Sequence, residues 1–169
     1  MKFYANPYNT DVTGFYFETY EEFLEKSAAL PDGFDSTVEE FEIDVIDGEL
    51  TEIQLVSAIG VNQGNLEEVI EFIDTSDESD WPSIFYQLDN GVTWSLDDAI
   101  HKADEFCIVE SNLQEAATEL FDECYGESIP EAVKPYIDYE SFAHDCRLGG
   151  DMVEFEFGGK TYTCTNANQ

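Results

Sequence analysis

The sequence predicts an α+β fold, with small antiparallel sheets and helices toward both ends of the chain and short helices in the middle. Three observations predict it: acid–hydrophobe alternation over residues 40–45, repeated helix-start signals through the middle, and Gly158-Gly159 between two strand-like runs. Of the 169 residues, 43% are hydrophobic and 14% aromatic. Disordered acidic chains lack this aromatic content, so we expect a folded protein with a real core.

The first part, residues 1–49, is predicted to be a β-rich domain with one helix. Strand-like runs at residues 2–4 and 12–17 flank a turn-rich segment at residues 6–9. Thr19 and Glu22 form a capping-box pair, and the helix they begin, with an apolar face of Phe23, Leu24 and Ala28, ends before Pro31. The period-two run at residues 40–45 predicts a half-buried strand whose acidic face carries Glu40, Glu42 and Asp44.

The middle part, residues 50–104, is predicted to be helical. Three times, a residue that favours helix N-caps is followed three positions later by an acidic or amide residue and then by apolar residues at helical spacing: Thr51/Gln54, Asn65/Glu68 and Ser95/Asp98. Asp80 is placed to cap a further helix with Pro82 in its first turn. In the segment after Asn65, an apolar face opposes an acidic one. The acidic face consists of Glu67, Glu71 and Asp74.

The last part, residues 105–169, is predicted to be an α+β domain that mediates dimerisation. A strand at residues 106–109, helices at 111–125 and 139–147, a capping box at Ser128/Glu131 and a hairpin of residues 152–157 and 160–164 are expected. On the first helix, a stripe from Leu113 to Cys124 faces inward. The opposite side carries Glu115, Glu119, Asp122 and Glu123. Because Phe106 and Ile108 lie in an apolar stretch with few acids, they are the candidate dimer contacts.

The charge is the main functional signal. Against 39 Asp and Glu stand 6 Lys and Arg, giving a formal net charge of -33, and no Lys or Arg lies between Lys26 and Lys102. This charge excludes nucleic acid and anionic membranes as partners and requires a basic one. Since duplex DNA carries one charge per ~1.7 Å, the excess equals that of about 16 base pairs.

The spacing of the acids also resembles DNA. Carboxylates on a helix face are separated by ~6 Å along the axis and those on a strand face by ~6.7 Å, intervals similar to the distance between neighbouring phosphates. The ten acids named above are therefore candidates for a DNA-mimic surface. The alternative is a passive acidic coat, as in halophilic proteins, which implies no partner.

Enzymatic function is not indicated. No nucleotide-binding loop, nucleophile elbow or HExxH motif occurs, and carboxylate pairs carry no information in so acidic a chain. The four cysteines form no CxxC pair, so we expect reduced, mostly buried thiols, no metal and no cofactor. His144 and Cys146 lie two apart on a predicted helix and point in different directions. Without a signal peptide or a membrane-length apolar run, a cytoplasmic location is expected.

One C-terminal block resembles a known family. Pro130 begins a run that continues to Tyr136-Ile137-Asp138-Tyr139, and Asp145 follows. This pattern resembles the ArdA family of antirestriction proteins, as does the N-terminal Tyr4-Ala5-Asn6. The departures are Tyr16, where the family usually has Trp, and His144, where it usually has Arg.

The resemblance implies a three-part, elongated subunit that forms a homodimer through its C-terminal part and mimics bent DNA. It also implies a non-enzymatic inhibitor, carried by mobile genetic elements, that binds the methyltransferase core and specificity subunit of type I restriction–modification enzymes. Other DNA-binding targets, such as a CRISPR effector or a nucleoid protein, remain open alternatives.

Overall fold

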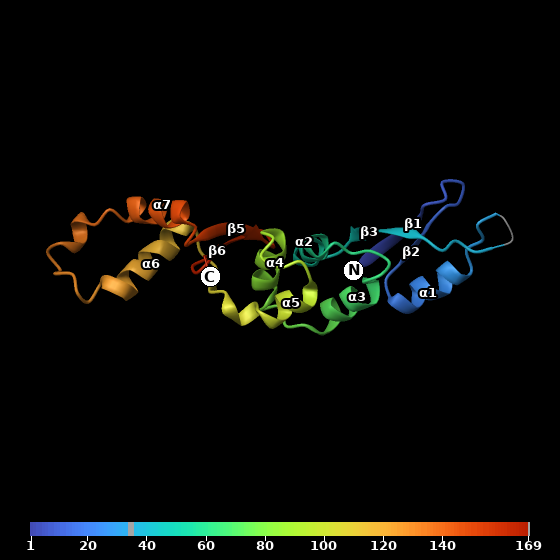
Figure 1. Cartoon of the computed structure of the whole chain (residues 1–169), viewed down its shortest axis with the longest axis horizontal. Coiled ribbons are helices and arrows are strands. Elements are labelled where there is room, and N and C mark those ends of the chain that lie inside the picture. The colour runs from blue at the N-terminus through green and yellow to red at the C-terminus, as the bar shows by residue number, and fades with distance from the viewer. Residues whose placement is uncertain (34–35, 169) are drawn as a thin grey trace. The chain divides into compact units, whose positions relative to one another are not determined.

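The computed structural model describes residues 1–33 and 36–168, and it confirms the α+β prediction (Figure 1). The chain divides into two compact units, residues 1–81 (unit 1) and 82–169 (unit 2). The boundary falls inside the segment 50–104, and the three-part division stays a prediction.

The sheet of unit 1 has three antiparallel strands in the order β2-β1-β3. They are β1 (Lys2–Pro7), β2 (Phe15–Phe17) and β3 (Phe41–Asp47), so β3 lies at an edge. Ala5 of β1 pairs with Ile43 of β3 and with Phe15 of β2. Alternation along the strands buries one face, because every second residue is apolar.

Three helices accompany this sheet: α1 (Tyr20–Ala28), α2 (Leu50–Ile59) and α3 (Leu66–Thr75). Their buried residues and those of the inner sheet face form one core, which includes Phe3, Phe17, Phe23, Leu66 and Val69. Thr19 caps α1 as predicted, accepting a hydrogen bond from the Glu22 backbone N–H. Only Phe23 of the predicted apolar face of α1 is buried, whereas Leu24 and Ala28 are exposed.

The start of α2 differs from the prediction. Glu49, not Thr51, is the N-cap, and it forms a capping box with Glu52, so the helix begins at Leu50. The Thr51/Gln54 pair has the right spacing, but both residues lie inside the helix, at its second and fifth positions. In the loop after α2, the Gln63 side chain accepts a hydrogen bond from the Phe41 N–H at 3.0 Å and donates one to the Glu39 carbonyl at 3.0 Å.

Unit 2 begins with helices α4 (Trp81–Asp89, whose first residue closes unit 1) and α5 (Leu96–His101), followed by the 3-10 turn η1 (Ala103–Glu105). Ser95 caps α5 through the Asp98 N–H, as predicted. Gln87, fully buried on α4, donates to the carbonyls of Ser83 and Ala99 and so ties α4 to α5.

The sheet of unit 2 has the order β4-β6-β5, with strands β4 (Ile108–Val109), β5 (Val153–Phe157) and β6 (Lys160–Cys164). Gly158 and Gly159, with φ values of 60° and 76°, make the predicted hairpin turn, which requires positive φ at both positions. Phe85 of α4 packs on Phe157, with ring centroids 4.9 Å apart.

The helices α6 (Leu113–Tyr125) and α7 (Tyr139–Gly149) pack side by side, with the 3-10 turn η2 (Lys134–Tyr136) between them in sequence (Figure 1). Ala117, Ala143, Cys146 and Met152 form a buried cluster in this part. No helix begins at Ser128, contrary to its capping-box spacing with Glu131, because Ser128 instead donates its hydroxyl to the Tyr125 carbonyl and turns follow.

The cysteine prediction is half right. All four thiols are free, with Cys146 and Cys164 buried but Cys107 and Cys124 exposed. Cys124 therefore does not continue the inward stripe of α6. Phe121 takes its place, in ring contact with Phe142 at 5.1 Å.

Candidate functional site

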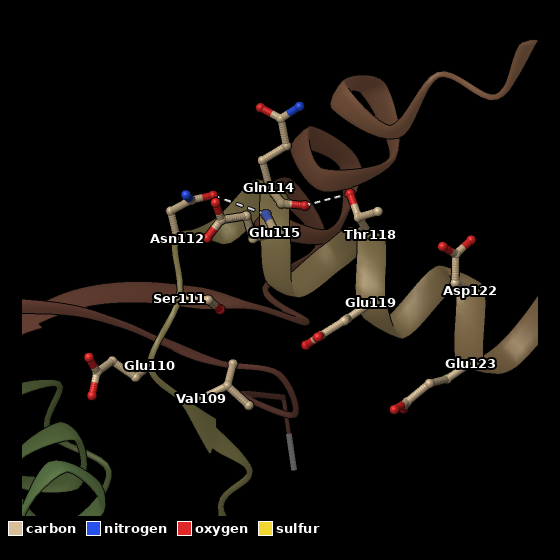
Figure 2. Close-up of a pocket in the computed structure, with 10 residues that line it drawn as sticks. All are labelled: Val109, Glu110, Ser111, Asn112, Gln114, Glu115, Thr118, Glu119, Asp122 and Glu123. Carbon is tan, nitrogen blue, oxygen red and sulfur yellow. Dashed lines mark hydrogen bonds between the residues drawn. The ribbon is translucent and has the colours of Figure 1, made fainter. Parts of the chain in front are cut away.

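A groove along α6 gathers all four acids predicted on that helix. Its volume is about 1010 Å³, and Figure 2 shows its lining side chains on α6 and on the segment that leads into the helix. The lining residues are Val109, Glu110, Ser111, Asn112, Gln114, Glu115, Thr118, Glu119, Asp122 and Glu123. Five of them carry a carboxylate and none of them is Lys or Arg, so acidic side chains are the only charged residues that line the groove.

The helix orients these acids by its cap and its small inner residues. Asn112 is the N-cap, and its side chain accepts a hydrogen bond from the Glu115 N–H at 3.0 Å. Ala116 and Ala117 are buried, which turns the opposite side of α6 to solvent. Glu115, Glu119 and Glu123 follow one another at four-residue spacing and are all exposed. Their backbone positions therefore rise by ~6 Å per step along the axis.

Asp122 is held by a residue of the C-terminal sequence block. The Tyr139 hydroxyl donates a hydrogen bond to Asp122 Oδ1 at 2.8 Å, and this bond raises the pKa of Tyr139 above its usual value. Lys134, whose ammonium pairs with Glu131 at 2.6 Å, lies in the same hollow as Asp122. The block thus orients one carboxylate of the groove.

Glu110 is the one acidic lining residue of the groove that was not predicted from the sequence. Its carboxylate accepts from the Lys160 ammonium of β6 at 2.8 Å, and the contact raises the pKa of Lys160. Glu110 lies outside the helical repeat, so no periodicity pointed to it. The available signal was its position two residues before the N-cap of α6, where the chain turns to enter the helix.

The cations among the described residues are largely engaged. Lys26 pairs with Glu22 at 3.1 Å, and Lys134 and Lys160 are paired as described. Lys2 lies over the Tyr16 ring, 5.0 Å from its centroid. Most of the described carboxylates therefore lie outside these ion pairs, and no Asp or Glu that the structure describes is buried.

The predicted acids of unit 1 form two separate sets. Glu42 and Asp44 on β3, together with Glu40 just before it, are exposed, and they alternate with Phe41 and Ile43 in the core. They therefore lie on the outer face of the sheet, where Glu42 opposes Asn6 and Asp44 opposes Tyr4.

Glu67, Glu71 and Asp74 are exposed on α3, whose Leu66 and Val69 enter the core against the inner sheet face. The two acidic sets of unit 1 thus lie on opposite sides of its sheet. One flat partner surface cannot contact both.

Asp138 in the sequence block has a structural role. It is the N-cap of α7, accepting hydrogen bonds from the Ser141 N–H at 2.9 Å and the Ser141 hydroxyl at 2.8 Å. These bonds hold the pKa of Asp138 below its usual value. Pro130, Tyr136 and Asp145 are exposed, Tyr136 by 86%, and Ile137 is half-buried.

The two candidate dimer contacts are half-buried within the single chain. Phe106 packs against Tyr86, with ring centroids 5.5 Å apart. Ile108 lies on the edge strand β4, where it pairs with Cys164 of β6. Both keep partial exposure.

Among the described residues, no group of three or more His, Cys, Asp or Glu could hold a metal ion. His144 is exposed and Cys146 is buried, so they point apart as expected. Across residues 1–33 and 36–168, no helix has the length and apolar character needed to cross a bilayer.

Comparison with models of protein families relates the chain to a known family. The model of a family described as antirestriction protein (ArdA) matches residues 15–160, which is most of the chain. A search of curated proteins returns no match.

Proposed function

We propose that the chain, which belongs to the ArdA family of antirestriction proteins, inhibits type I restriction–modification enzymes by occupying their DNA-binding groove. Membership of this family supports an antirestriction function, and the family is one of inhibitors rather than of known enzymes. The proposal adds the mechanism: carboxylates bind where DNA phosphates would bind.

The α6 groove is the observation that carries this mechanism. DNA presents grooves bordered by rows of negative charge, into which a protein helix or ribbon inserts. The α6 groove is likewise concave and carries five carboxylates, with no Lys or Arg among its lining residues. A basic segment of the enzyme that normally enters DNA therefore finds matching shape and charge there.

The acids of unit 1 are a separate part of the proposal. Because Glu42 and Asp44 lie on one side of the sheet and Glu67 and Glu71 on the other, they suit a partner that encloses its ligand. Enzymes that surround duplex DNA have such a binding site. In our proposal the methyltransferase core and specificity subunit of a type I enzyme provide it, in the cytoplasm where incoming DNA is cut.

A homodimer is part of the proposal. Ile108 lies on an edge strand, which can accept a strand from another chain, and Phe106 is only half-buried. Dimerisation through this region would double the charge offered to the enzyme. Sedimentation at micromolar concentration should give the mass of two chains, and a strict monomer would contradict this part.

The decisive experiment is competition with DNA. A labelled duplex is bound to a purified type I enzyme, and the protein is titrated against poly-L-glutamate of matched net charge as the control. We expect the protein to displace the duplex far more effectively than the polymer, and added salt to weaken its binding because the enzyme's Lys and Arg are then screened. Displacement no better than that by the polymer would favour a passive acidic coat.

A cleavage assay separates the candidate targets. The protein should block DNA cleavage by the type I enzyme at concentrations that displace the duplex. Displacement of DNA from a CRISPR effector or a nucleoid protein with equal potency would instead make the inhibitor general.

A further inference from the structure

The loop between α4 and α5, which can be located in Figure 1, contains Trp94, a residue that the charge-based mechanism does not use. Trp94 is 91% exposed, whereas Trp81, the other tryptophan of the chain, is 3% exposed. Val92 and Ile100 nearby in sequence are each 42% exposed. Tryptophan is on average highly buried in folded proteins, and exposed apolar groups mark interaction sites when they form a patch.

Trp94 has no evident role in the fold of unit 2. It directly precedes Ser95, the N-cap of α5, where a hydrophobic residue often packs on the fourth helical position as a staple. That position, Ala99, is fully buried, but the indole remains exposed and makes no such staple. Burial therefore does not explain a tryptophan here.

The loop nevertheless anchors the backbone that carries the indole. Gly91, with φ of 66°, turns the chain, and a Cβ there would lie 3.5 Å from the Trp94 ring, so the ring rests beside this glycine. Next along the loop, the N–H groups of Val92 and Thr93 donate to the carbonyl of buried Gln87 at 2.8 and 3.2 Å. Trp94 is thus presented on an anchored turn, which reduces the entropy lost on binding.

The charges near Trp94 in sequence indicate which ligand fits. Exposed carboxylates precede and follow it at Asp89, Asp97 and Asp98, and Asp97 lies 3.4 Å from the His101 imidazole. A tryptophan face attracts cations more strongly than other rings do, and arginine stacks on it while its remaining N–H groups reach carboxylates. The chain already contains a cation–π contact, between the Lys2 ammonium and the Tyr16 ring.

We propose that Trp94, with its flanking carboxylates, is a binding site for an arginine side chain of the enzyme's DNA-binding surface. The identity of this partner rests on the proposed function. Where acids imitate phosphates, Trp94 supplies a flat aromatic face, as a base does, on which a guanidinium stacks. Recognition then combines distributed charge with one local anchor, because buried tryptophans commonly dominate interface energies.

Oligo-arginine and oligo-lysine of equal length, both free of tryptophan, test the chemistry on the protein alone. The wild type should bind oligo-arginine more tightly and change its tryptophan emission, and Trp94→Ala should weaken oligo-arginine binding by about 2- to 5-fold while Trp94→Phe retains part of the preference. Equal binding of both peptides, or a preference unchanged in Trp94→Ala, would overturn the proposal.

Inhibition of the enzyme gives the second readout. Trp94→Ala should weaken displacement of DNA by about 2- to 30-fold, the upper figure applying if the stacked pair is desolvated. Leu148→Ala, which removes another side chain of unit 2 that is 72% exposed, is the matched control and should not change displacement. Full potency of Trp94→Ala would overturn the arginine site alone, whereas a wild type that cannot displace DNA would refute the proposed function and leave the peptide result to judge Trp94.

Discussion

Reversal of the middle acid of the α6 row should stabilise the protein while impairing its function. Glu119 has Glu115 four residues before it and Glu123 four residues after it, all exposed on one helix. Each like-charged pair at this spacing costs about 0.2–0.5 kcal/mol, and an opposite-charged pair gains a similar amount. Glu119→Lys converts both pairs, so the expected gain is about 0.8–2 kcal/mol. For a chain of this length that raises the thermal midpoint by about 2–8 °C.

The same reversal should weaken DNA displacement only modestly. An exposed ion pair contributes about 0.2–1 kcal/mol, and one reversal removes one attraction and adds one repulsion. The loss is therefore about 2- to 30-fold. Reversing Glu115, Glu119 and Glu123 together triples the free-energy change, to about 1–6 kcal/mol, and should weaken displacement by about 10- to 10⁴-fold. Asp122 is left unchanged so that its hydrogen bond with Tyr139 survives.

Thermal unfolding followed by circular dichroism measures the first effect, and competition with a labelled duplex measures the second. The control is an equal charge change on acids outside the proposed surface: Asp11→Lys with Glu21→Lys and Glu25→Lys, all exposed in unit 1. A midpoint that falls in Glu119→Lys would refute the repulsion argument. Equal loss of displacement in the control and in the α6 triple would show that net charge, rather than the groove, determines binding.

Three further outcomes are expected. The thermal midpoint should rise as salt increases from about 0.01 to 0.15 M, because the screening length falls from ~30 to ~8 Å; a protein that folds only in molar salt would support the halophile alternative. Hydrogen bonds lower the pKa of Asp138 in the folded state, so the contribution of Asp138 to stability should be present at neutral pH. It should be lost as the pH falls below about 3.9 and through the lowered pKa. The thermal midpoints of Asp138→Ala and the wild type should therefore differ at pH 7 and converge in acid. In a thiol-reagent assay, exposed Cys107 and Cys124 should react fast and Cys146 and Cys164 slowly, since burial raises the pKa of both and blocks access, while denaturant should equalise all four.

The sequence predicted those helix starts and turns that depend on residues only a few positions apart. The caps at Thr19 and Ser95 act on the N–H groups expected, and the glycine pair makes the expected hairpin turn. Spacing alone failed where a competing partner was closer. Asn65 is the N-cap residue of α3 as predicted, but its side chain accepts from the Asn62 N–H at 2.7 Å and makes no cap hydrogen bond to the helix.

The candidate site was predictable where periodicity defines a face. All ten proposed acids are exposed, because the apolar residues of the same strand or helix pack into the core and leave the acidic face to solvent. Glu110 and the bond from Tyr139 to Asp122 were not predictable, since they depend on contacts between segments distant in sequence. The position of the α3 acids, across the sheet from those of β3, likewise follows from packing alone.

The edge position of β3 has a consequence for the protein at high concentration. An open edge strand invites another chain to add a strand, which is a route to aggregation. Here the Gln63 amide already occupies the backbone groups of Phe41 and Glu39, as a neighbouring strand would. The Glu42 and Asp44 carboxylates repel an identical strand farther along. The acids proposed to attract an enzyme would therefore also keep copies of the inhibitor from joining at this edge.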